Sequence, residues 1–178
     1  HTLGWPLGGE ASGGGFLYHY GEDLVAIGLV IHLDYRNPYL SPFDEFQRLK
    51  THPKIAAVLK GGECLGYGAR TTNEGGLQSL PRLVFPGGAL IGDDAGFLNA
   101  ARSKGSHAAI HSGSLAAEAC FAALMTNRQR DELVMYPDEF RRNWLYDELL
   151  RTRNFKSWMD KGLKFGALMF GIEQQLFG

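Results

Sequence analysis

The chain has 178 residues, 44% hydrophobic and 21% charged, which is enough apolar material to bury the core of one domain or slightly more. Eighteen basic side chains against nineteen acidic ones give a net charge of −1, which argues against a nucleic-acid-binding surface. The two cysteines, Cys64 and Cys120, form no C-x-x-C pair, and we expect buried thiols in a reducing compartment rather than a disulfide.

A β-hairpin is predicted near the start of the chain. Residues 16–20 and 24–32 are rich in β-forming side chains and are joined by the turn residues 21–23. Glycines 13–15 precede the first of these strands. Without side chains, they let a flat ligand approach the backbone, whose N–H groups can donate to a carbonyl; a loop that only needs positive φ is the alternative.

Two short helices follow the hairpin. Ser41 is a good cap and Pro42 a good first residue, and acidic side chains stand in the first turn, so a helix is predicted from there to about Lys50. A second helix is expected over 53–60, before a glycine pair.

The next elements are strands at 63–71 and 82–91 and a long helix at 105–125 whose packing face is rich in Ala, Ser and Gly. Two more helices are expected, at 137–152 and 155–172. The order of hairpin, helices, single strands and long helix is that of an α+β protein rather than a regular βαβ series.

The stretch from residue 87 to the start of the long helix carries the strongest chemical signal. An apolar strand ends in Gly92-Asp93, and a glycine-punctuated loop leads to a helix that begins with a small polar residue. The unpaired N–H groups and positive dipole end at a helix start favour a phosphate or the electron-rich end of a reduced flavin. A carboxylate at the strand end can hold a ribityl hydroxyl. The alternative is an ordinary strand–loop–helix crossover.

His107 and His111 stand four residues apart on that helix, a spacing compatible with a metal. The sequence offers no third ligand, so no metal site is expected.

Short sequence words along the whole chain carry a family resemblance. They are residues 1–7, 13–14, 16–19, 33–35, 37–43, 45–48, 67–70, 73–76, 78–79 and 104–107. Together they resemble the middle and later part of an electron transfer flavoprotein–ubiquinone oxidoreductase, and the match covers nearly all of the chain.

The resemblance implies an electron-transferring-flavoprotein dehydrogenase, which passes electrons from reduced electron transfer flavoprotein through FAD and a [4Fe–4S] cluster to ubiquinone. Such a protein lies on the surface of the bacterial cytoplasmic membrane or the mitochondrial inner membrane. We expect the chain to be a fragment that is inactive alone: it begins without Met, has no G-x-G-x-x-G, and its two cysteines are fewer than the about four thiolates of a cluster. The dinucleotide-binding unit and the iron–sulfur domain are then missing.

The resemblance also implies a two-domain FAD flavoprotein similar to p-hydroxybenzoate hydroxylase. Residues 1–70 are expected to form most of an antiparallel ubiquinone-binding sheet domain. Residues 71–126 are expected to return to the FAD domain, and 127–178 to form a helical segment with a membrane-surface helix.

Site residues follow from the same resemblance. Gly13 and Gly14 align with the ubiquinone head-group site, where Ser12 replaces a frequent tyrosine. Asp93 stands where these oxidoreductases often have cysteine, although the wider class uses Gly-Asp. No catalytic acid or base is expected, because electron transfer needs none. The expected FAD-binding residues are Gly92, Asp93, Gly96, Asn99, Gly105 and Ser106.

The tail from 158 to 172 is apolar, with lysines near its start. Its uncharged part is far shorter than the ~20 residues of a spanning helix, so an amphipathic helix in the membrane surface is predicted. A helix that docks on the iron–sulfur domain is the alternative. The expected membrane-surface residues are Trp158, Phe165, Met169 and Phe170.

Other functions share parts of this pattern. A FixC-like oxidoreductase or a reductase of isoprenoid (geranylgeranyl) lipids has the same flavin motif. A monooxygenase-type hydroxylase would consume NAD(P)H and react fast with oxygen, whereas a quinone reductase would do neither. A non-catalytic membrane-docking module is a further alternative.

Overall fold

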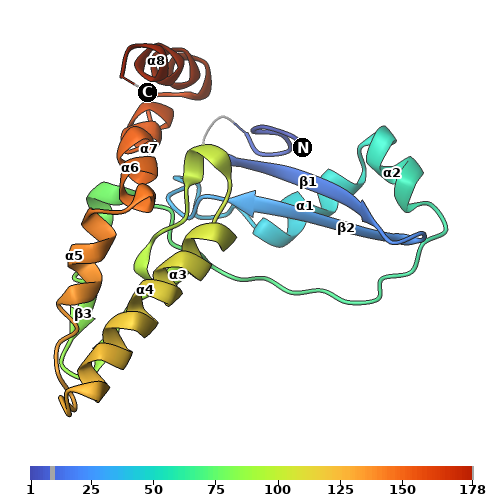
Figure 1. The fold of residues 1–178 in the computed structure, drawn as a ribbon. Helices are drawn as coiled ribbons and strands as arrows, with labels where there is room; N and C mark the ends of the chain where they lie inside the picture. Colours follow the sequence, from blue (N-terminus) through green and yellow to red (C-terminus); the bar gives the residue numbers. More distant parts are fainter. Residues whose placement is uncertain (9–10, 178) are drawn as a thin grey trace. The chain divides into compact units, whose positions relative to one another are not determined.

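The computed structural model describes residues 1–8 and 11–177, and the chain divides into two compact units, His1–Gly68 (unit 1) and Ala69–Gly178 (unit 2) (Figure 1). Each unit combines helices with one small antiparallel sheet. The chain is therefore of mixed α and β type.

Unit 1 is built on the predicted hairpin, which is confirmed. Strands β1 (Gly13–Tyr20) and β2 (Leu24–Ile31) pair antiparallel from Gly13 opposite Ile31 to Tyr20 opposite Leu24. Gly21 has a φ of 63° in the connecting turn, a conformation that favours glycine. Strand β1 begins earlier than predicted because the three glycines belong to the paired strand rather than to a loop before it.

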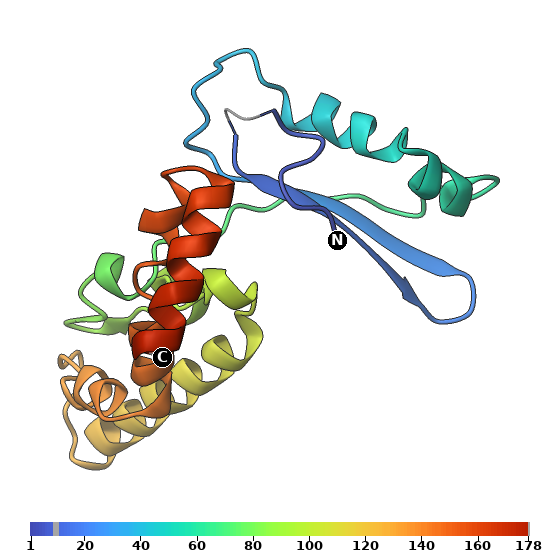
Figure 2. The ribbon, with the colours of Figure 1, turned by 90° about the horizontal axis from the view of Figure 1, so that it is seen from above.

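The two predicted helices of unit 1 are also confirmed as α1 (Pro42–Lys50) and α2 (Pro53–Leu59). The Ser41 hydroxyl accepts a hydrogen bond from the Asp44 N–H at 3.3 Å, as a helix cap should. Helix α1 runs alongside the hairpin (Figure 2). Its one buried residue, Leu49, packs against the backbone of Gly15.

The strand predicted at 63–71 is wrong. None of the described residues pairs with this stretch, and all of its side chains are exposed, up to 99% for Tyr67. A strand needs a neighbour to take up its backbone N–H and C=O groups, and sequence pattern alone does not supply one.

Unit 2 is mostly helical. The strand predicted at 82–91 is instead a short hairpin, because Pro86 and Gly87, with a φ of 83° at the glycine, form a turn. The elements are η1 (Leu77–Ser79), β3 (Val84–Phe85), β4 (Gly88–Ala89), α3 (Gly92–Ala95), η2 (Ala100–Arg102), α4 (Ser106–Met125), α5 (Met135–Arg141), α6 (Trp144–Arg151), α7 (Phe155–Met159) and α8 (Leu163–Phe177).

The long helix is confirmed as α4, but each of the two later predicted helices is broken in two. Asn143 separates α5 from α6, and its side chain caps α6 by accepting a hydrogen bond from the Leu145 N–H at 3.3 Å. Gly162, with a φ of 105°, separates α7 from α8. Both breaks use a capping or left-handed residue that an unbroken apolar pattern conceals.

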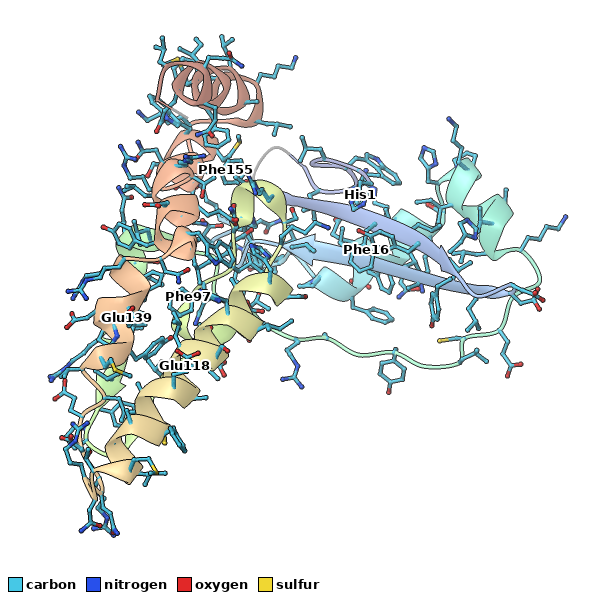
Figure 3. All side chains as sticks on the ribbon, in the orientation of Figure 1. His1, Phe16, Phe97, Glu118, Glu139 and Phe155 are labelled. Atoms are coloured by element: carbon cyan, nitrogen blue, oxygen red, sulfur yellow. The ribbon has the colours of Figure 1, made fainter. Side chains whose placement is uncertain are left out.

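The core of unit 2 lies between α4, α5 and α6. Phe97, labelled in Figure 3, is fully buried, with its ring 4.9 Å from that of Phe140. Tyr136 is also fully buried and donates its hydroxyl to the Leu90 carbonyl at 3.0 Å. Burial raises the pKa of Tyr136 to about 12, although a hydrogen bond with Ser112 opposes the rise. This phenol is therefore neutral at physiological pH.

Helix α4 is the one helix among the described residues with the length and hydropathy of a membrane span. Its inner face, including Ala108, Ser112 and Leu115, is buried in the core of unit 2. Its outer face carries Cys120. That thiol and Cys64 are both exposed, so the prediction of buried thiols is wrong: one lies on an exposed extended stretch and the other on the uncovered side of a helix.

Candidate functional site

The predicted flavin motif folds as a short helix, α3, set against the long helix α4. Gly92 has a φ of 58°, and its N–H donates to the buried Ser112 hydroxyl at 3.0 Å. A Cβ at Gly92 would lie 3.2 Å from the Ala109 side chain. Gly92 is thus required both by its conformation and by the close approach of the two helices.

Asp93 follows directly and carries an unpaired acceptor. Its Oδ1 atom is buried and accepts no hydrogen bond from any described residue. A Cβ placed on Gly105 would lie 2.9 Å from this oxygen. The carboxylate therefore lies against the residue that begins α4, where glycine leaves it uncovered.

The beginning of α4 has free backbone donors. Gly105 is the N-cap and offers no side-chain hydrogen bond to the first turn, and Ser106 is exposed. The N–H groups of a first helical turn have no partner within the helix and attract an anion. The predicted residues Asp93, Gly105 and Ser106 are thus brought together.

Two other predicted FAD residues have structural roles within the protein. Gly96 ends α3 with a φ of 92°, a left-handed cap that glycine adopts most readily. Asn99 is only 1% exposed; its Oδ1 accepts from the Arg102 N–H and its Nδ2 donates to Glu148. Asn99 therefore shapes the loop before α4 through bonds that leave its side chain little capacity for a ligand.

The motif fits a flavin nucleotide. An unpaired buried acceptor costs about 1–3 kcal/mol, which a ribityl hydroxyl donated to Asp93 would recover. The first turn of α4 supplies N–H donors for an electron-rich ring edge or a phosphate. These are the two contacts expected from the sequence.

Glu148 is the residue of this region that sequence reasoning missed. It accepts hydrogen bonds from Asn99 at 2.8 Å and from His107 Nε2 at 2.9 Å, and Arg102 lies 3.5 Å from its other oxygen. Burial alone would raise its pKa, but the bonds from Asn99 and His107 and the charges of His107 and Arg102 outweigh that effect and lower the pKa of Glu148 below its usual value. The carboxylate is ionised at neutral pH.

The two histidines of α4 are occupied by protein contacts. His107 bonds to Glu148, and His111 Nε2 lies 2.6 Å from the Asn143 side-chain oxygen. Both rings also lie against the indole of Trp144. Among the described residues, no group of three or more potential ligands is placed to hold a metal.

The predicted quinone glycines lie on the edge of β1 that faces the N-terminal segment. The Thr2 N–H donates to Gly15 and the Gly4 N–H donates to Gly13, at 2.7 and 2.8 Å. A Cβ on Gly14 would overlap the Thr2 carbonyl, and Gly13 has a φ of 147°. Close backbone packing therefore already requires glycine at both positions, so a quinone would have to approach their half-buried backbone from a side other than the Cβ direction.

The predicted membrane-surface residues differ in exposure. Phe165 is 51% exposed, whereas Trp158, Met169 and Phe170 are half-buried. The Trp158 indole N–H is donated to Glu173, which ties α7 to α8. Four exposed apolar residues of α8 lie along one helical stripe: Phe165, Leu168, Ile172 and Leu176. Leu176 lies beyond the stretch that the sequence indicated, and the exposed Leu163 lies on another side of the helix.

Comparison with known proteins follows the division into units. Residues 1–72 match the family model described as ETF-QO, ubiquinone-binding. The first unit is thus similar to a class of quinone-binding domains.

The whole chain has relatives under one name. It is 54% identical to the electron transfer flavoprotein–ubiquinone oxidoreductase of Pseudomonas aeruginosa, over all of this chain and 33% of that protein. It is 46% identical to the mitochondrial protein of that name from Oryza sativa subsp. japonica, over 99% of this chain and 30% of the relative. The human mitochondrial protein of that name is 50% identical, over 88% of this chain and 26% of the relative.

The chain therefore belongs to the electron transfer flavoprotein–ubiquinone oxidoreductase family, as the sequence words predicted. It spans about a third of the length of these two curated relatives.

Proposed function

We propose that the complete protein containing this chain takes electrons from reduced electron transfer flavoprotein and delivers them to ubiquinone through FAD. The observation that carries the proposal is sequence similarity along the entire chain to oxidoreductases of that name, at up to 54% identity. The names favour this reaction over reduction of isoprenoid lipids, because the relatives above are all ubiquinone oxidoreductases.

We assign ubiquinone binding and FAD binding to different parts of the chain. Residues 1–70 form most of the ubiquinone-binding domain, residues 71–126 return to the FAD domain, and 127–178 form a helical segment. The complete protein then has the two-domain arrangement of flavoproteins such as p-hydroxybenzoate hydroxylase. Exposed apolar side chains on α4, such as Ile110 and Phe121, support the presence of a further part of the FAD domain against this helix.

FAD, when bound, accepts and donates the electrons. Asp93 holds a hydroxyl of the cofactor, and the first turn of α4, at Gly105 and Ser106, donates backbone N–H groups to it. Gly13 and Gly14 offer backbone to the quinone head group. A [4Fe–4S] cluster requires about four thiolates, so we place its ligands outside this chain.

We further propose that α8 lies on the membrane surface. The support is the exposed stripe around Phe165, Leu168 and Ile172, with Lys164 beside its first member. Ubiquinone is a membrane lipid, so a protein held on the membrane surface can take it up from the bilayer. The protein would then be peripheral on the respiratory membrane.

The cofactor proposal has a direct test. The complete protein is expected to bind FAD non-covalently in stoichiometric amount, whereas this chain alone binds it weakly or not at all, because no G-x-G-x-x-G phosphate-binding loop occurs in it. Flavin absorbance of both purified proteins after desalting measures this. Stoichiometric FAD on the chain alone would show that the adenine site lies within it, and a complete protein without flavin would refute the proposal.

The quinone assignment is tested by Gly14→Leu in the complete protein. We expect ubiquinone reduction to be abolished with flavin content intact, since the glycine lies in unit 1 and the flavin residues in unit 2. Steady-state quinone reduction and flavin absorbance are the two measurements.

Two controls separate quinone contact from damage to the strand. Gly66→Leu adds the same side chain in the same unit where nothing lies nearby, and it should behave as wild type. Thr2→Val removes the hydroxyl that accepts from the Gly15 N–H without filling the glycine edge. If Thr2→Val loses quinone reduction as completely as Gly14→Leu, the glycine acts through strand pairing and the direct contact is refuted.

A further inference from the structure

A cluster of polar side chains joins α6 to the loop that precedes α4. Glu148 is its centre, and only 14% of its side chain is exposed although it is an ionised carboxylate. It accepts from Asn99 at 2.8 Å on the loop and from His107 at 2.9 Å in the first turn of α4. These partners precede it by 49 and 41 residues, so the contacts are tertiary.

The loop that precedes α4 is held by several hydrogen bonds. The backbones of Asn99 and Lys104 exchange two hydrogen bonds, and the Asn99 Oδ1 accepts from the Arg102 N–H. Ser103 completes the loop with a φ of 52°, a left-handed conformation that a residue other than glycine seldom adopts. A loop with such a conformation persists only when its surroundings hold it.

The first turn of α4 is also held to Glu148. An ionised carboxylate only accepts hydrogen bonds, so His107 donates through Nε2. Leu145 and Leu149, on either side of Glu148 in sequence, are buried in the core and fix α6 itself. Glu148 thus links a rigid helix to both segments that meet at Gly105.

From this geometry we propose that Glu148 is a positioning residue for the flavin site: through Asn99 and His107 it holds the loop and first turn that present Gly105 and Ser106 to the cofactor. The inference rests on the proposed FAD function and extends it to a residue outside the flavin motif. Its carboxylate also places a negative charge beside the N-terminus of α4, where it interacts favourably with the positive end of the helix dipole.

Three variants of the complete protein test the role. Glu148→Ala removes the carboxylate oxygen that accepts from both Asn99 and His107. Glu148→Gln keeps an amide oxygen but removes the charge, and Asp147→Asn makes the same charge change at an exposed neighbour on α6. The measurements are the dissociation constant for FAD by titration of apoprotein, the apoprotein melting temperature, and the midpoint potential of the bound flavin.

For Glu148→Ala we expect the FAD dissociation constant to rise about tenfold or more, the size of a lost hydrogen bond to a charged group. Glu148→Gln should weaken FAD less and shift the midpoint potential upward, because removing a nearby negative charge favours the more negative reduced flavin. Asp147→Asn should match wild type in all three measurements.

A structural role alone would lower the melting temperature and leave the dissociation constant and potential of the folded protein unchanged, and that result would overturn the inference. If Glu148→Ala does not fold, Glu148→Gln provides the test. A wild-type dissociation constant for FAD and a wild-type midpoint potential in that variant would also overturn the inference. A wild-type protein without FAD would instead refute the proposed function, so the two failures are distinct.

Discussion

Replacing Gly105 with valine is expected to leave the complete protein without bound FAD. A Cβ there would lie 2.9 Å from Asp93 Oδ1 and 3.2 Å from Leu98, so a branched side chain would cover the unpaired carboxylate and the start of α4. Gly105 has a φ of −128° and a ψ of −29°, outside the left-handed region that favours glycine, so the expected loss comes from the added side chain and not from a positive φ. Flavin absorbance of the purified variant gives the result.

Gly113→Ala is the matched control, because it also adds carbon to a glycine of the same helix. Its Cβ would make only an ordinary contact, 3.8 Å from Ile91, and alanine favours a helix interior by up to about 1 kcal/mol. We expect normal flavin content. Asp93→Ala, which removes the acceptor itself, should lose FAD as Gly105→Val does. Stoichiometric FAD in both Gly105→Val and Asp93→Ala would exclude this motif from the site.

The second large effect is expected from charges on the exposed stripe of α8. Phe165→Asp combined with Leu168→Asp should release the complete protein from anionic liposomes and raise its apparent KM for a long-tailed ubiquinone. These two side chains are 51% and 62% exposed, and burying each in lipid is worth roughly 1.5–3 kcal/mol. The new carboxylates also oppose the attraction of Lys164 to anionic lipid, about 1 kcal/mol per charge. Co-sedimentation and steady-state kinetics measure both effects.

Ala167→Asp, at an exposed position of the same helix outside the stripe, adds a charge with the loss of only a methyl group and should stay bound. A short-tailed, water-soluble quinone should be reduced by the double variant at nearly the wild-type rate. If the double variant co-sediments like wild type, α8 packs against another part of the protein and the docking alternative holds.

Local signals in the sequence were sufficient for the hairpin and the two helices of unit 1. The Ser41 hydroxyl accepts from one free N–H of the helix start, that of Asp44 three residues later, and the turn at Gly21 closes a hairpin of adjacent strands. Each of these elements finds its hydrogen-bond partners nearby in the chain, so a local pattern contains the whole interaction.

Elements whose partners are distant were not predictable in the same way. The stretch at 63–71 has the composition of a strand, but pairing depends on a neighbour that composition does not reveal. Glu148 lies in an ordinary amphipathic helix, and only the folded chain brings it to Asn99 and His107. The helix breaks at Asn143 and Gly162 contain recognisable cap residues, but the continuous apolar pattern around them favoured the prediction of unbroken helices.

The flavin motif combines features that the local sequence predicted with contacts that only the folded chain reveals. Gly92 and Asp93 were recognisable because a strand end and a helix start follow each other closely. The structure adds that the Asp93 oxygen is unpaired and lies against Gly105, twelve residues later in the sequence, and that Asn99 is committed to Glu148. The site residues themselves stay predictions.

The central claim is that the complete protein carries electrons from electron transfer flavoprotein to ubiquinone. The most direct measurement mixes the purified complete protein with reduced electron transfer flavoprotein and a ubiquinone under anaerobic conditions and follows both reactants by absorbance. We predict catalytic oxidation of the flavoprotein with one ubiquinone reduced per two electrons, and no need for NAD(P)H. Ubiquinone that stays oxidised while a flavin-loaded protein consumes NAD(P)H and oxygen would contradict the account.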